Sequence, residues 1–135
     1  MSGQPQLGTL TNAIGIDCTK LEVLDPGGAS NLIVERNTDF QVRAHFEFGG
    51  LFANYLVSLP IPYKVIYYYE IMGGGPEGIL AEKEGKTTVA KLVYEDETIA
   101  TARLSVPGTY KLTVVVHFEG APMTAFTEGP LIQVF

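Results

Sequence analysis

Hydrophobic and polar residues alternate with a period of two along most of this chain. In the clearest segment, from Phe40 to Phe48, every second residue is apolar and those between are polar. Residues 98–106 and 110–119 repeat the pattern. Because successive side chains of a β-strand point to opposite faces, each segment is predicted to be a strand with one buried and one solvated face.

A fourth strand is predicted over residues 63–72, and its middle is apolar on both faces. Shorter or less regular alternation predicts further strands at 20–24, 31–35, 80–84, 89–94 and 131–135. Turn residues separate these segments, among them Asp25-Pro26-Gly27-Gly28, Gly73-Gly74-Gly75-Pro76 and Pro107-Gly108. Short strands at intervals of about ten residues, without long helical patterns, indicate an all-β sandwich or barrel.

The chain reads as one domain with a short leading segment. We expect residues 1–17 to form a flexible N-terminal arm and residues 18–135 to form the folded domain. With 46% hydrophobic residues among 135, such a domain can bury a core without disulfides or metals.

The segment Leu104-Ser-Val-Pro-Gly-Thr-Tyr-Lys-Leu112 resembles the corner between strands E and F of the immunoglobulin fold. In that family, a tyrosine at the place of Tyr110 bonds through its hydroxyl to the backbone of the corner. Gly108 also matches the pattern, and Leu112 stands where antibody domains have a cysteine. The resemblance implies an antiparallel Greek-key sandwich of about seven strands, of the disulfide-free immunoglobulin-like or fibronectin type III-like kind.

Charge and composition restrict the partners of this domain. The formal net charge of −6 argues against a nucleic-acid partner, because phosphate binding needs an excess of basic residues. No segment approaches the roughly 20 apolar residues of a membrane span. The N-terminus lacks a signal-peptide pattern, and the chain has a single cysteine. These features favour a cytoplasmic location.

The residues that could carry chemistry do not form a recognisable site. His45 and His117 fall on the outward faces of strands expected in opposite sheets, so they are not expected to share a metal. The acidic run Glu95-Asp96-Glu97 fits a solvated turn, and Cys18 fits a small buried residue. We therefore predict no metal, no cofactor and no enzymatic activity.

Two regions carry more apolar surface than a lone sandwich requires. The connection at 51–63 is almost entirely apolar, so it either fills one end of the sandwich or docks on a partner. The outer face of the sheet that holds 63–72 and 110–119 is the second region. The candidate interface residues of these two regions are Leu51, Phe52, Tyr55, Leu56, Ile66, Tyr68, Val115 and His117.

These observations predict a non-catalytic module for protein interaction or structure that self-associates through an apolar sheet face, most simply as a homodimer. The partner is then a protein, either a second copy or a different chain. A second hypothesis is a sandwich that binds a carbohydrate or another small ligand with its tyrosines. Enzymatic activity is the third and least supported alternative.

Overall fold

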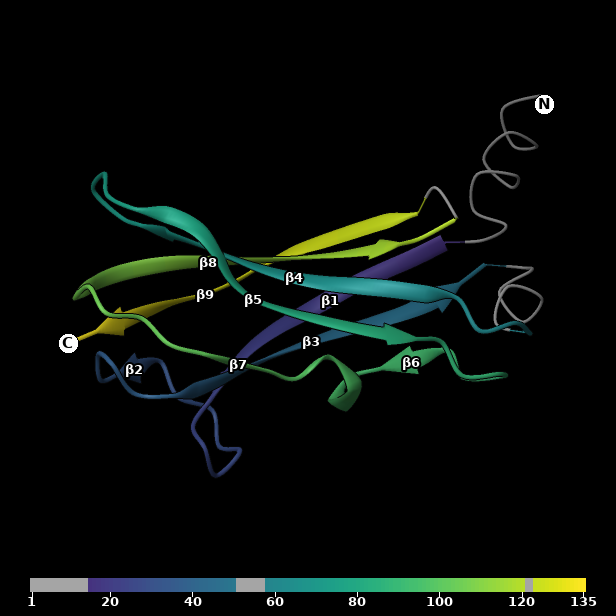
Figure 1. Cartoon of the computed structure of the whole chain (residues 1–135), viewed down its shortest axis with the longest axis horizontal. Coiled ribbons are helices and arrows are strands. Elements are labelled where there is room, and N and C mark those ends of the chain that lie inside the picture. The colour runs from purple at the N-terminus through teal and green to yellow at the C-terminus, as the bar shows by residue number, and fades with distance from the viewer. Residues whose placement is uncertain (1–14, 51–57, 121–122) are drawn as a thin grey trace, which may run out of the picture.

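The protein was analysed as a computed structural model that describes residues 15–50, 58–120 and 123–135. Nine strands and one short 3₁₀ turn make up its regular structure, and no α-helix occurs in this part of the chain (Figure 1). Their bounds are β1 Gly15–Leu24, β2 Ile33–Val34, β3 Phe40–Gly49, β4 Pro62–Ile71, β5 Glu77–Lys86, β6 Val93–Tyr94, η1 Asp96–Thr98, β7 Ala100–Ala102, β8 Gly108–Phe118 and β9 Thr124–Val134.

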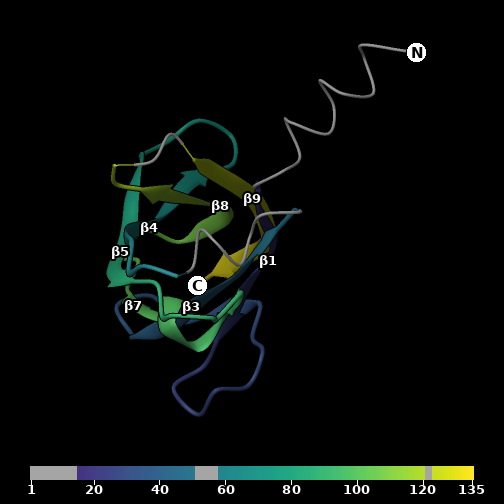
Figure 2. The same cartoon turned by 90° about the vertical axis from the view of Figure 1, so that its right-hand side faces the viewer.

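The strands form two sheets that lie face to face (Figure 1). The smaller sheet has the order β1-β3-β6, and β7 also pairs with β3. The larger sheet has the order β2-β9-β8-β4-β5 and curls around the core (Figure 2). All pairs are antiparallel except β2 with β9. The predicted all-β architecture is therefore confirmed.

The inward positions predicted for residues 40–48 and 110–118 are confirmed, since each of these side chains is buried. Five aromatic rings from both sheets meet in the core, near the end where β3 and β8 finish and β4 begins. The Phe46 ring stacks on Tyr94 with centroids 4.9 Å apart and meets the Phe118 ring edge-on at 5.9 Å. Such geometries add to the free energy gained from burying the rings. The cluster consists of Phe46, Phe48, Tyr63, Tyr94 and Phe118.

A buried polar network also joins the two sheets. The Tyr67 hydroxyl, from β4, donates a hydrogen bond of 2.7 Å to the carbonyl oxygen of Thr98. The Thr98 hydroxyl accepts a 2.8 Å bond from the amide of Ala44 in β3 and lies 2.6 Å from the carbonyl oxygen of Glu95. Thr98 is fully buried. The network therefore satisfies buried polar groups that would otherwise destabilise the fold.

The turn before β8 has the bond that the family resemblance implies. The Tyr110 hydroxyl donates a hydrogen bond of 2.6 Å to the carbonyl oxygen of Val106. Gly108 adopts φ 153°, and a Cβ at this position would lie 2.7 Å from Cδ1 of Ile71. Residues with a side chain rarely adopt this positive φ, so glycine is favoured at this position. Leu104 is buried beneath the same corner.

Some predicted strand boundaries were wrong. The predicted strand at 98–106 shrinks to Ala100–Ala102 because residues 96–98 form the 3₁₀ turn, and Val106 is exposed. The last strand begins at Thr124 instead of 131, because Gly129-Pro130 lies within β9 and does not end it. Three of the nine strands have only two or three residues. Of the predicted N-terminal arm, residues 15–17 belong to β1 and the others lie outside the described residues.

Replacing Tyr110 with phenylalanine tests the corner bond. The loss of a hydrogen bond to a part-buried carbonyl is expected to lower the free energy of unfolding by about 1–2 kcal/mol. Urea denaturation measures this difference. Tyr68→Phe is the matched control, because the Tyr68 hydroxyl makes no hydrogen bond within the described part of the chain. Equal stability of the two variants would contradict a structural role for the corner bond.

Candidate functional site on the outer face of the larger sheet

The outer face of the larger sheet carries an apolar row that crosses three strands. Ile66 of β4 is the register partner of Val115 in β8, and Val115 is the partner of Phe126 in β9. All three side chains alternate with buried residues and therefore point away from the core. Ile66 and Val115 are half-buried, whereas Phe126 is 68% exposed. We call Ile66, Val115 and Phe126 the apolar row.

A bulge in β9 is what turns Phe126 outward. Leu131 pairs with Lys111 and Glu128 pairs with Thr113, so two residues of β9 oppose Leu112 alone. Before the bulge, the odd-numbered residues of β9 point inward, as the buried Ala125 shows. After the bulge, the even-numbered residues point inward, as the buried Ile132 shows. Without the extra residue, Phe126 would face the core.

Further side chains extend the apolar row along the strands. Tyr68 pairs with Thr113 on one side and with Ile79 of β5 on the other. Ile79 is 54% exposed. Leu131, the register partner of Lys111, is 53% exposed and is separated from Phe126 by Glu128, the partner of Thr113. Single exposed hydrophobic residues are ordinary, but contiguous ones mark interaction surfaces.

Charged groups form the rim of this face. The Lys64 ammonium lies 3.6 Å from a carboxylate oxygen of Glu82 and 3.9 Å from one of Glu84. The Lys111 ammonium lies 3.2 Å from the Glu128 carboxylate. These pairs are exposed and contribute little stability. Their arrangement around an apolar centre resembles the core and rim of a protein interface.

Four of the eight predicted interface residues share one face of the structure. Ile66, Tyr68, Val115 and His117 lie on the same outer face. His117 is exposed, and its Nδ1 lies 3.2 Å from the Thr124 hydroxyl. The other predicted residues, Leu51, Phe52, Tyr55 and Leu56, lie outside the described residues.

The sequence prediction missed Phe126 and Ile79, which are 68% and 54% exposed on this face. Phe126 was missed because the last strand was predicted to begin at 131. The alternation of Thr124, Ala125 and Phe126 could have revealed the missing part of the strand.

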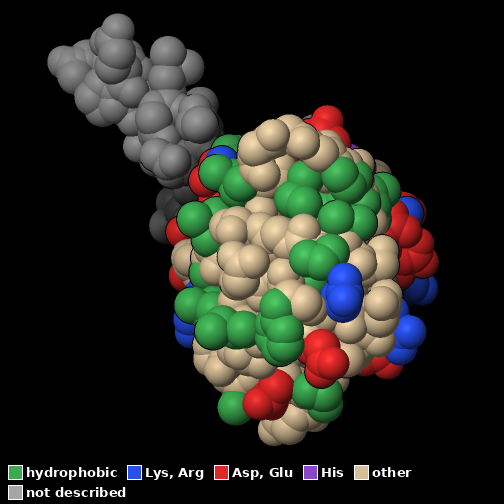
Figure 3. All heavy atoms as spheres, turned by 90° about the vertical axis from the view of Figure 1, so that its left-hand side faces the viewer, with side chains coloured by type: hydrophobic (Ala, Val, Ile, Leu, Met, Phe, Trp, Pro, Cys, Tyr) green, Lys and Arg blue, Asp and Glu red, His purple; other side chains and the backbone are tan. Residues whose placement is uncertain are grey.

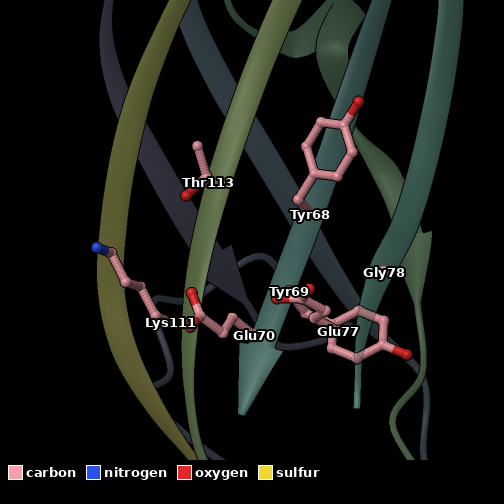
Figure 4. A pocket seen from close by; sticks show the side chains of 7 residues that line it. All are labelled: Tyr68, Tyr69, Glu70, Glu77, Gly78, Lys111 and Thr113. Carbon is pink, nitrogen blue, oxygen red and sulfur yellow. The ribbon is translucent and has the colours of Figure 1, made fainter. Parts of the chain in front are cut away.

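A polar groove of about 380 Å³ borders the apolar row (Figure 4). The Tyr68 ring stands at one end of it, while Glu70 and Glu77 come from the neighbouring strands β4 and β5. Lys111 extends away toward β9, consistent with its pairing to Glu128. The groove could offer carboxylates and one aromatic face to a small ligand.

The smaller sheet presents a different outer face. There the Arg43 guanidinium lies 3.0 Å from the Glu22 carboxylate and 3.3 Å from that of Asp96. The two ring nitrogens of His45 lie 3.9 Å from Glu47 and 3.8 Å from Glu95. Charges on this face are thus paired with one another, and it offers less apolar surface for a partner.

Histidine, cysteine and acidic side chains do not gather into a metal site within the described residues. No cluster of three or more potential ligands is found there. His45 and His117 lie in different sheets, as the sequence predicted. No helix in the same residues is long and apolar enough to cross a membrane.

The β5 edge of the larger sheet is poorly suited to pairing with another strand. β5 carries Glu82 and Glu84 on its outer side, and Lys83 between them points to the inner side. A register shift at Leu80 also distorts this edge. Charges and bulges on edge strands oppose pairing with a second chain.

One end of the sandwich shows hydrophobic side chains in separate groups (Figure 3). Backbone, polar and acidic groups interrupt them in this view. The C-terminal residue, Phe135, lies at this end (Figure 1) and is 58% exposed. The outer face of the larger sheet is therefore the better candidate for an interaction surface, because its apolar residues adjoin one another in register.

Comparisons with known proteins bear on the fold. Neither family models nor the sequences of curated proteins match this chain. Among solved structures, the CARDB domain of the PF1109 protein from Pyrococcus furiosus, solved in complex with di-metal ions, is similar with a TM-score of 0.51 and 11% identity. The match covers 90% of this chain and 87% of that one. At this identity the likeness concerns the fold alone.

Spo0M, a sporulation control protein from Bacillus subtilis, is a weaker match, with a TM-score of 0.46 and 9% identity over 90% of this chain. This chain spans about half of Spo0M, since the match covers 49% of that protein.

The position of Cys18 generates a prediction about thiol reactivity. Cys18 points into the core, and burial raises its pKa to about 11. The native thiol should therefore react with maleimide at pH 8 at least 100-fold more slowly than the unfolded chain, as fewer thiolates form and access is blocked. Rapid labelling of the native protein would contradict this placement.

The same raised pKa predicts that the free energy of unfolding falls as the pH rises from about 9 to about 11, because the thiol of the unfolded chain loses its proton at a lower pH than the native thiol.

Proposed function

We propose that this protein is a non-catalytic interaction module that binds a protein through the outer face of its larger sheet. The apolar row, Ile66-Val115-Phe126, carries the proposal. Its three side chains adjoin across neighbouring strands, and the largest of them is 68% exposed. Apolar surface of this kind is stabilised when a partner removes it from water.

The position of the row supports binding to a macromolecule over binding deep within a pocket. The row lies on an open sheet face, and Tyr68, the next outward residue of β4 after Ile66, pairs with the exposed Ile79 of β5. Ion pairs of Lys64 and Lys111 flank it. An apolar centre with a polar rim suits a protein interface, in which water is excluded from the centre.

We also propose that the sandwich follows the immunoglobulin-like Greek-key order. In that order β1, β3 and β7 correspond to strands A, B and E, and β4, β5, β8 and β9 to strands C, C′, F and G. The Tyr110 corner bond and the pairing of β4, β8 and β9 support this assignment. The likeness to the CARDB domain is consistent with it.

Binding of a carbohydrate or another small ligand is the second candidate function, and the groove beside Tyr68 favours it (Figure 4). An aromatic ring next to carboxylates is a common way to hold a sugar or an organic cation. Titration with glucose, cellobiose and spermine, followed by NMR shifts of Thr113 and Gly78, tests this candidate. Saturable shifts that Tyr68→Ala abolishes would support it; no shifts with any of these probes would contradict it for these classes of ligand.

Replacing Phe126 with serine tests whether the apolar row is exposed for binding or needed for folding. A residue 68% exposed contributes little to the core, so the free energy of unfolding should change by less than about 0.5 kcal/mol. The fluorescence of an apolar dye bound to the native protein should fall at least two-fold. Phe135→Ser, with a similar exposed fraction but outside the apolar row, is the control. A loss of more than about 2 kcal/mol would indicate a structural residue instead.

A further inference from the structure

We propose that the partner on this face is a second copy of the chain, packed about a two-fold axis that runs parallel to β8 above Val115. This inference rests on the proposed function and specifies its partner. It follows from the symmetry of the apolar row, because β4 and β9 flank β8 on its two sides. A rotation about β8 therefore places β4 of each copy on β9 of the other.

The side chains of the apolar row are complementary under this rotation. Val115 meets Val115 of the second copy on the axis. Phe126 meets the second copy's Ile66, and the contact is repeated by symmetry on the other side. Phe126 is 68% exposed, whereas Ile66 is half-buried. Each exposed ring thus packs on the less exposed Ile66 of the other copy, and the same surface serves both copies, as a self-complementary interface requires.

The neighbouring row is compatible with the same arrangement. The rotation brings Tyr68 toward Glu128 of the second copy, since these residues flank Thr113 in register. The Tyr68 hydroxyl has no partner within the described residues and can donate to that carboxylate. Lys111 lies close to the axis, but the Glu128 of its own chain, 3.2 Å away, compensates its charge.

The area of the face predicts a weak dimer. The face spans four strands spaced about 4.8 Å apart, and each strand contributes four outward-pointing side chains spaced about 6.8 Å apart along it. The face therefore covers on the order of 500 Å² per copy. The total of about 1,000 Å² lies at the lower limit for specific interfaces. We therefore expect reversible dimerisation with a dissociation constant in the micromolar range or above.

Other modes of self-association fit the structure less well. One alternative is pairing of β5 with β5 of a second copy about an axis perpendicular to the sheet. The outward residues of both copies would then lie on the same side, so Glu82 of one copy would face Glu84 of the other and the two carboxylates would repel. The outer face of the smaller sheet already satisfies its charges internally, through pairs such as Arg43 with Glu22. A second copy packed on the apolar row would instead remove apolar surface from water.

Sedimentation equilibrium over a range of concentrations tests the dimer. The unmodified chain should dimerise, and Phe126→Glu should raise the dissociation constant at least 100-fold, because a carboxylate would enter both symmetric contacts. Phe135→Glu is the matched control and should leave the constant within two-fold. Phe135 is nine residues further along the chain, about 30 Å in extended conformation. Thermal unfolding checks that both variants remain folded.

Cross-linking tests the position of the axis. Facing sheets are about 10 Å apart, too far for a disulfide, so Val115→Cys in a Cys18→Ser background is treated with a short bis-maleimide. This variant should give a covalent dimer, whereas Thr101→Cys, exposed on the smaller sheet, should not. A dimer that is insensitive to Phe126→Glu, or equal cross-linking of both cysteines, would overturn the proposed arrangement.

A chain that stays monomeric at millimolar concentration would overturn the second copy as partner. The proposed docking function would then be decided separately by the dye and stability measurements on Phe126→Ser, which do not depend on dimer formation. Failure of those measurements would overturn both proposals.

Discussion

The structure depends on one geometric constraint: alternate side chains of each strand must enter a core shared by two sheets. On β3 and β8 this requirement fills the inner positions with apolar residues, and near one end the ring of Phe46 packs between Tyr94 and Phe118. It leaves the outer positions free to be polar. Where the outer positions are apolar as well, at Ile66, Val115 and Phe126, the core does not explain the choice of residue.

The buried polar network adds directional contacts between the two sheets to the packing of their side chains. Tyr67 of one sheet bonds the carbonyl of Thr98, whose hydroxyl bonds Ala44 of the other. Because these groups are buried, a shift of either sheet would leave several of them unsatisfied. The network thus fixes the position of β4 relative to β3, and with it the strand that carries Ile66 and Tyr68.

The candidate interface depends on the register of β9. The bulge opposite Leu112 reverses which residues of β9 face the core, and so places Phe126 beside Val115 instead of among the buried rings. Gly129 lies in this bulge, where a Cβ would come within 2.6 Å of Leu21. A close approach of β1 and an outward Phe126 are therefore consequences of the same local irregularity.

The sequence by itself determined the all-β class, the inward residues of β3 and β8, the Tyr110 corner and the apolar outer positions of β4 and β8. Each follows from local alternation or from a short motif, which depend on neighbouring residues only. The tertiary structure alone decided the extent of β5, the bulge within β9 and the Tyr67–Thr98 network. Pairing between distant strands controls these features, because it allows Gly129-Pro130 to continue a strand that local turn preferences would end.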